Sequence, residues 1–140
     1  MRVVIDTNCL LASIPPRSPS YALYKEFVAE RFTWAVSNEI LTEYAEQLTA
    51  MYSPATTDLV LTILTVAPNT LFQEAYFKWQ LTEQDHDDRD VGPDKFVDVA
   101  VAAGADYLVT NDGHFDMLKR IELPKVTVIS LQNFLALLNV

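Results

Sequence analysis

Short apolar runs alternate with amphipathic segments along the chain. The run Val3–Ile5 is apolar and β-branched, which is typical of a strand buried on both faces. Similar runs predict further strands over residues 32–36, 107–110 and 126–129. Residues 69–81 predict short extended pieces, and residues 84–93 form a polar loop rich in Asp.

Apolar residues recur at helical spacing between these runs. The spacing predicts helices over residues 20–31, 37–48, 53–68, 94–103, 115–120 and 130–138. Ser37, Ser53 and Ser130 stand at positions suited to N-caps, and Gly104 is suited to end a helix. In the last helix we expect Phe134, Leu135, Leu137 and Leu138 to face inward, whereas Cys9–Ala12 predicts an apolar turn.

The alternation of strands and helices predicts an α/β fold with a parallel sheet and helices on both faces. The sequence has no internal repeat and no linker-like segment, so residues 1–140 are expected to form a single domain.

Composition narrows the class of protein. Hydrophobic residues make up 50% and charged residues 21% of the chain, which is ordinary for a globular domain. Apolar runs stay far below the ~20 residues that span a bilayer, and Asp6 interrupts any signal-peptide pattern. The one cysteine, Cys9, excludes an internal disulfide. We therefore expect a cytoplasmic protein that does not enter a membrane.

The charge balance leaves two interpretations open. The chain carries 19 acidic and 10 basic residues, a net charge of −9, which repels a polyanionic partner overall. The protein either never meets nucleic acid, or concentrates its acids at a cation site where bound metal cancels part of the charge.

Several acids stand where a parallel sheet would bring them together. Asp6 and Asp112 each follow a predicted strand, within the runs Asp6–Asn8 and Thr110–Asp112. Ligands of open α/β sheets bind outside the carboxyl ends of the strands. Two further pairs lie four residues apart on predicted helices that start at that edge: Glu39 with Glu43, and Asp94 with Asp98.

Clustered carboxylates repel one another unless they are protonated, paired or bound to a cation. Oxygen ligands from acids, hydroxyls and amides suit Mg²⁺ or Mn²⁺, and the sequence has no Cys/His spacing typical of zinc. Such a site suits phosphodiester hydrolysis, with Thr7 or Asn8 holding a water or a phosphate oxygen.

Each acid also has a purely structural interpretation, and for Asp6 it is that of a turn acid at the end of a strand. Asn111–Asp112–Gly113 is a good turn on its own. Glu39 and Asp94 are acids of a first helical turn, where the helix dipole favours them. Glu43 and Asp98 could be solvated helix surface.

Taken in order, these motifs resemble the PIN-domain nucleases, in particular the toxins of toxin–antitoxin pairs. The residues that carry the resemblance span nearly the whole chain: Val3–Asn8, Ser37–Tyr44, Asp94–Asp112 and Gly113–Asp116. The resemblance implies a three-layer α/β/α PIN-like domain with a central, mostly parallel sheet. It also implies a metal-dependent ribonuclease, an antitoxin protein as partner and possible homodimerisation.

Position by position, the resemblance matches Asp6, Glu43 and Asp112 to acids of the family. Counting back from Thr110 matches the remaining acid to Asp94, and Asp98, one turn further on, could share its task. Val91–Gly92–Pro93 stands where relatives carry acids, which could weaken or rearrange one metal position.

The leading hypothesis is therefore an endoribonuclease that uses Mg²⁺ or Mn²⁺ to cleave RNA. Its candidate metal-binding and catalytic residues are Asp6, Glu43, Asp94, Asp98 and Asp112. Supporting polar residues are Thr7, Asn8, Thr110 and Asn111. Candidate phosphate-binding residues are Arg17, Arg89 and Lys95.

Two other classes remain as alternatives. A magnesium-dependent phosphatase usually needs a second Asp at position 8, where this chain has Asn8, and a phospho-acceptor domain needs a late-strand lysine that Val126–Leu131 lacks. A catalytically inactive interaction module would keep the fold and use its acidic surface to bind a basic partner.

Overall fold

The central sheet of the computed structural model is parallel throughout. The structure describes residues 1–80 and 94–140, and these form a five-stranded sheet in the order β3-β2-β1-β4-β5. The strands are β1 (Arg2–Ile5), β2 (Thr33–Val36), β3 (Thr70–Phe72), β4 (Tyr107–Val109) and β5 (Val128–Ile129). Each neighbouring pair runs parallel, which confirms the predicted α/β class.

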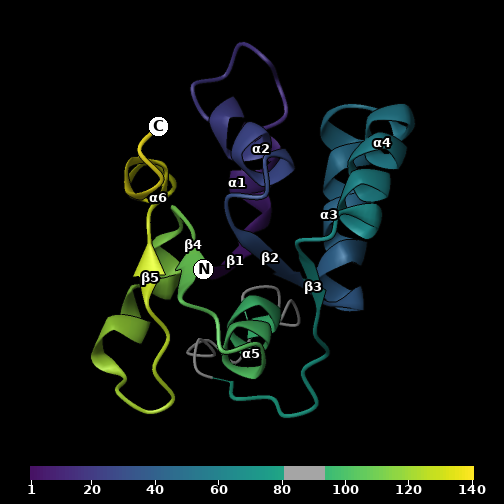
Figure 1. Ribbon diagram of the computed structural model, residues 1–140. Helices are drawn as coiled ribbons and strands as arrows, with labels where there is room; N and C mark the ends of the chain where they lie inside the picture. Colours follow the sequence, from purple (N-terminus) through teal and green to yellow (C-terminus); the bar gives the residue numbers. More distant parts are fainter. Residues whose placement is uncertain (81–93) are drawn as a thin grey trace.

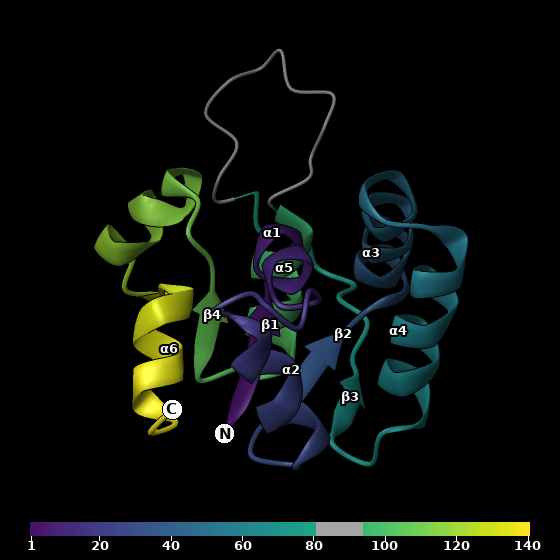
Figure 2. The same cartoon turned by 90° about the horizontal axis from the view of Figure 1, so that it is seen from above.

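Helices cover both faces of this sheet. They are α1 (Thr7–Ala12), α2 (Tyr21–Val28), α3 (Asn38–Met51), α4 (Pro54–Val66), α5 (Asp94–Ala102), the 3-10 helix η1 (Gly113–Arg120) and α6 (Leu131–Leu137). Figure 1 shows α5 on one face and α1, α2 and α6 on the other. The same layers, with α3 and α4 packed beside each other along the β2–β3 side, are visible from above in Figure 2. The three-layer arrangement follows the prediction.

The core is built from the strands and from a cluster of aromatic rings. Val3, Val4 and Ile5 have no exposed surface, as expected of a central parallel strand covered on both faces. Beside them, the ring of Phe27 meets the ring of Trp34 edge-on at 5.2 Å. Phe134 from α6 packs against Phe32, the residue before β2, with ring centroids 5.3 Å apart.

Local sequence signals set most helix boundaries. The hydroxyls of Ser37, Ser53 and Ser130 accept hydrogen bonds from backbone N–H groups in the first turns of α3, α4 and α6, as predicted. Gly104 has a positive φ of 60° just after α5, a conformation that glycine adopts without strain. The prediction missed α1, because a helix of 6 residues has too few positions to show a helical period.

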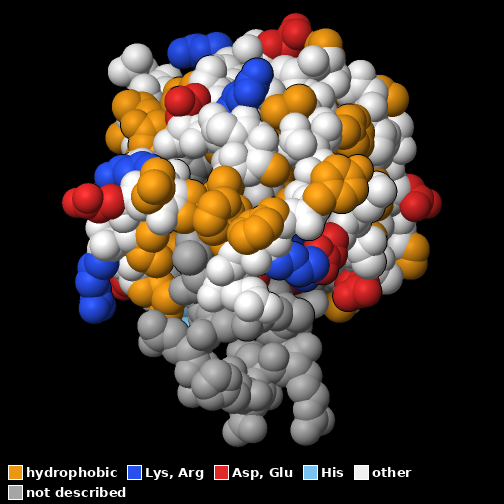
Figure 3. Space-filling model, turned by 90° about the horizontal axis from the view of Figure 1, so that it is seen from below, with side chains coloured by type: hydrophobic (Ala, Val, Ile, Leu, Met, Phe, Trp, Pro, Cys, Tyr) orange, Lys and Arg blue, Asp and Glu red, His pale blue; other side chains and the backbone are white. Residues whose placement is uncertain are grey.

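Some apolar side chains do not enter the core. The inward orientation expected for Leu137 is wrong, since this residue is 46% exposed. On α4, Leu59 and Val66 are also exposed, because this helix buries only the stripe Thr57, Val60 and Leu64. Further apolar side chains gather on the face that carries α5, as Figure 3 shows. Among the described residues, no helix is long and apolar enough to cross a membrane.

The order of the strands creates a switch point between β1 and β4. The chain first proceeds from β1 outward to β2 and β3, then returns through α5 to β4 on the other side of β1. Ligands of such sheets bind in the crevice outside the carboxyl ends of the strands at this point. Asp6 and Thr110 directly follow the two strands concerned.

Candidate functional site

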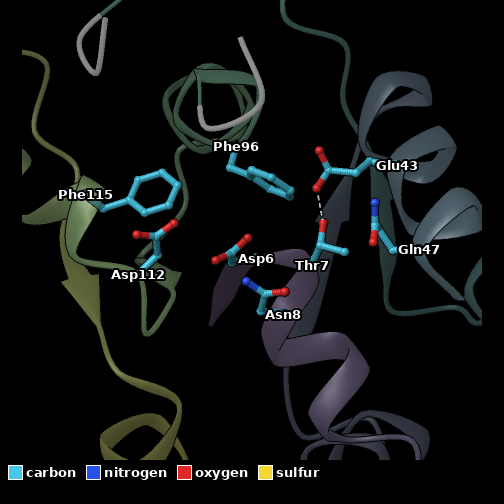
Figure 4. Close-up of a pocket in the computed structure, with 8 residues that line it drawn as sticks. All are labelled: Asp6, Thr7, Asn8, Glu43, Gln47, Phe96, Asp112 and Phe115. Carbon is cyan, nitrogen blue, oxygen red and sulfur yellow. Dashed lines mark hydrogen bonds between the residues drawn. The ribbon is translucent and has the colours of Figure 1, made fainter. Parts of the chain in front are cut away.

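A cavity of about 290 Å³ lies at this switch point. Figure 4 shows the carboxylates of Asp6, Glu43 and Asp112 turned toward its centre, with Asp6 between the other two. The residues that line it are Asp6, Thr7, Asn8, Glu43, Gln47, Phe96, Asp112 and Phe115. Acids separated by more than 100 positions in the sequence therefore meet in one cavity.

Asp6 is the innermost of these acids. It is buried between β1 and α1, and its backbone N–H is fixed by a 2.9 Å hydrogen bond to the carbonyl of Val109 on β4. Burial raises the pKa of its carboxyl above the usual value; the hydrogen bond from Thr110 opposes this shift, and the charge of Asp112 adds to it. The protein therefore holds an acid where its charge is costly.

Thr110 connects Asp6 to Asp112. Its buried hydroxyl donates to Oδ2 of Asp6 at 2.8 Å and accepts a 3.0 Å hydrogen bond from the backbone N–H of Asp112. Asp112 caps η1 by accepting a 2.9 Å hydrogen bond from the N–H of His114, and this bond is the main cause that lowers the pKa of its carboxyl. Two adjacent carboxyls thus have pKa values shifted in opposite directions by their surroundings.

Glu43 is brought to the cavity by a buried tyrosine. The next residue on α3, Tyr44, donates a hydrogen bond to the carbonyl of Ile5 and accepts a 3.2 Å hydrogen bond from the indole N–H of Trp34. Since Ile5 directly precedes Asp6, this contact fixes α3 relative to the end of β1. This hydrogen bond therefore sets the position of Glu43 relative to Asp6.

Both oxygens of Glu43 have partners within the protein. Oε2 accepts a hydrogen bond from the hydroxyl of Thr7, drawn as a dashed line in Figure 4. Oε1 lies 2.6 Å from Nζ of Lys95, whose side chain is only 13% exposed. Glu43 is therefore held by a hydroxyl on one side and an ammonium group on the other.

The structure places Asp98 outside the cavity wall. Its Oδ1 accepts a 3.0 Å hydrogen bond from the backbone N–H of Trp79, in the segment that follows β3. Burial raises the pKa of Asp98, and the negative charge of Asp94, four residues earlier on α5, adds to this shift. Asp94 is buried at the start of α5 and does not line the cavity either.

The remaining expected residues fall in different places. Thr7 and Asn8 line the cavity, whereas the side chain of Asn111 accepts a 3.1 Å hydrogen bond from Leu131 N–H at the start of α6. Arg17 is exposed in the loop between α1 and α2 and does not line the cavity. Arg89 lies outside the described residues, as do the acids of the polar loop.

Sequence reasoning missed several residues of this site. Gln47 lies one helical turn after Glu43 and lines the same cavity, so helical spacing could have identified it. Phe96 and Phe115 are core residues whose rings also form its apolar wall. The contacts of Tyr44 and Lys95 with other elements depend on tertiary packing, which has no signal in a short stretch of sequence.

The donor set of the cavity fits a hard cation. Its polar groups are oxygens of carboxylates, amides and a hydroxyl, the ligands that Mg²⁺ and Mn²⁺ prefer. Asp6 and Asp112 are close enough for the charge of one to affect the pKa of the other. Within residues 1–80 and 94–140, however, no three acidic, His or Cys side chains are grouped closely enough to form a ready metal cage.

The fold and the site define a class: a parallel α/β domain with an acidic cavity at its switch point. Comparison with family models makes the assignment more specific, because the model of the PIN domain matches residues 2–114. The chain belongs to the PIN domain family.

A solved structure has the same fold. The chain is similar to a chain in the crystal structure of VapBC2 from Rickettsia felis bound to a DNA fragment from their promoter. The TM-score is 0.63 at 22% identity, over 93% of this chain and 98% of the other. No curated protein sequence matches this chain.

Proposed function

We propose that this protein is a metal-dependent endoribonuclease, the toxin of a toxin–antitoxin pair. The observation that carries the proposal is the convergence of Asp6, Glu43 and Asp112 on one cavity at the switch point of the sheet. Membership of the PIN domain family supports the same activity.

In this proposal, some residues of the cavity bind the metal ion and others position the substrate or a water molecule. Asp6 and Asp112 would hold Mg²⁺ or Mn²⁺ through carboxylate oxygens, and Thr110 keeps the first of them oriented by its hydrogen bond. Such an ion lowers the pKa of water and stabilises negative charge on a phosphate. Asn8 and Gln47, at the rim, have amide groups that can position a phosphate or a water molecule.

RNA is the proposed substrate despite the negative charge of the protein. The rings of Phe96 and Phe115 form an apolar wall of the cavity. Contacts with phosphates would be local, as expected where a net charge of −9 opposes long-range attraction. Arg17 is the exposed cation available for such a contact in the loop after α1.

Cleavage of a labelled single-stranded RNA in the presence of Mn²⁺ tests the activity. We expect the wild-type chain to cleave it and Asp6→Asn to lose at least about 100-fold in rate, the scale of removing one charge-stabilising group. Asp58→Asn is the matched control, because Asp58 is an exposed acid of α4 that does not line the cavity. Equal cleavage by wild type and Asp6→Asn would contradict the proposal.

The toxin role rests on separate support and needs a separate test. The similar fold occurs in a crystal structure of VapBC2, and an apolar groove between α2 and α4, lined in part by Tyr21, Tyr24 and Leu59, could receive a partner protein. Induced expression in a bacterial host should arrest growth, and Asp6→Asn should not. Growth arrest by both proteins would show that the effect does not depend on the acidic site.

A further inference from the structure

The ion pair between Lys95 and Glu43 is unusual in its position. Its N–O distance is 2.6 Å, and the two side chains are only 13% and 22% exposed. Charged groups at this depth are seldom retained unless they are paired, because removing them from water costs several kcal/mol per ion. Glu43 lines the cavity, and Lys95 contacts it from α5.

The three carboxylates of the cavity therefore divide into two groups. Glu43 is neutralised by Lys95 and accepts a further hydrogen bond from Thr7. Asp6 accepts a hydrogen bond from Thr110, and the charge of Asp112 raises the pKa of Asp6. Asp112 accepts a hydrogen bond from the N–H of His114 and lies 2.9 Å from Nδ1 of the same residue, whose side chain is 79% exposed. Negative charge thus remains concentrated at the Asp6–Asp112 end of the cavity.

We propose that Lys95 is a built-in cation that occupies the place of a second divalent ion, so that the cavity binds a single metal ion at Asp6 and Asp112. This proposal rests on the proposed metal-dependent function. Glu43 is then a positioning residue rather than a metal ligand: it orients Thr7 at the start of α1, next to Asp6. In this proposal, Lys95 pairs with Glu43 and does not bind the substrate phosphate.

Lys78 is an exposed lysine that serves as a comparison for the largely buried Lys95. Lys78 also pairs with a glutamate, Glu39, but at 3.8 Å and with a side chain that is 64% exposed. An exposed pair of this kind contributes little, since water and salt screen it. Removing either lysine changes the net charge of the protein equally, so Lys78→Met controls for a general electrostatic effect.

Titration of the full-length chain with Mn²⁺ by calorimetry tests the proposal. We expect one Mn²⁺ per wild-type chain. The charge-conserving double variant Glu43→Gln/Lys95→Met should also bind one ion, with an affinity within about threefold of wild type, whereas losing a true ligand costs about tenfold or more. Lys95→Met alone releases Glu43 and should bind Mn²⁺ more tightly or bind a second ion, and Lys78→Met should match the wild type.

Each of the following results would contradict the proposal. Two Mn²⁺ per wild-type chain, or a loss of tenfold or more in the double variant, would make Glu43 a metal ligand and overturn the proposal. If Lys95→Met binds Mn²⁺ as Lys78→Met does but binds RNA more weakly, then Lys95 contacts the substrate and the proposal is wrong. Failure of the wild type to bind any Mn²⁺ would remove the proposed metal-dependent function itself. Because the double variant removes both charges together, it leaves no unpaired buried ion that could unfold it.

Discussion

At the scale of single residues, Thr110 links the two acids of the switch point. One hydroxyl donates to the side chain of Asp6 and accepts from the backbone of Asp112. A donor that binds the charged form of a carboxylate lowers its pKa, and here it partly offsets the effect of burial. The pKa of Asp6 therefore depends on a neighbour that is not among the residues lining the cavity.

Thr110→Val keeps the shape of this side chain and removes the donor. We expect the pKa of Asp6 to rise, because only burial and the neighbouring charges then act on it. Carboxyl chemical shifts followed through an NMR pH titration of the metal-free protein measure this directly. Thr65→Val, at an exposed threonine of α4, is the control. An unchanged or lower pKa of Asp6 would refute the role assigned to Thr110.

The raised pKa of Asp6 also has a consequence for stability. An acid whose folded-state pKa lies above its unfolded value stabilises the fold only while it is protonated, and stability falls as the pH rises from the unfolded pKa through the folded one. At pH 7, ionised Asp6 therefore costs stability. Sites kept for function commonly carry such a cost.

Asp6→Asn should accordingly be more stable than the wild type at pH 7 without divalent ions. We expect a gain of about 1 kcal/mol, or roughly 2–4 °C in the melting temperature. The gain should disappear near pH 3, where Asp6 is protonated in both the folded and the unfolded state. Thermal unfolding across pH measures this gain. If Asp6→Asn is less stable than the wild type at pH 7, then ionised Asp6 does not destabilise the fold.

At the scale of elements, the boundaries of helices were easier to predict than their packing. Ser37, Ser53 and Ser130 are local signals, and each caps a helix as expected. Whether Leu137 faces the core depends on which element packs against that side of α6, and the local sequence does not determine this. For the same reason Glu43 could be predicted to face the cavity edge, whereas its partner Lys95 could be assigned only to phosphate.

The serines that precede helices differ in whether the hydroxyl makes a capping hydrogen bond. The hydroxyl of Ser37 accepts a 3.1 Å hydrogen bond from Ile40 N–H, whereas Ser20 precedes α2 without any side-chain capping bond. Ser37→Ala should therefore lower the free energy of unfolding by about 1 kcal/mol, and Ser20→Ala by much less. Urea unfolding of both variants compares them. Equal losses would indicate that the capping bond of Ser37 contributes nothing specific.

At the scale of the whole molecule, the order of the strands creates the site. Asp6 and Asp112 come from opposite ends of the chain and meet because β1 and β4 are neighbours in the sheet. The sequence predicted both acids, since each follows an apolar run, and parallel strands bring such positions to one edge. The hydrogen bond of Asp98 with the backbone of Trp79, away from the cavity, could not be predicted, because four-residue spacing fixes a helix face but not its neighbours.

We propose above that Asp6 and Asp112 hold a hard cation at the switch point of the sheet. Anomalous scattering from crystals grown with Mn²⁺ tests it most directly, because it locates the ion without reference to activity. We predict a single strong peak between the carboxylates of Asp6 and Asp112 in the wild type, and none in Asp112→Asn. A peak at another place in the molecule, or a peak that persists unchanged in Asp112→Asn, would contradict this account.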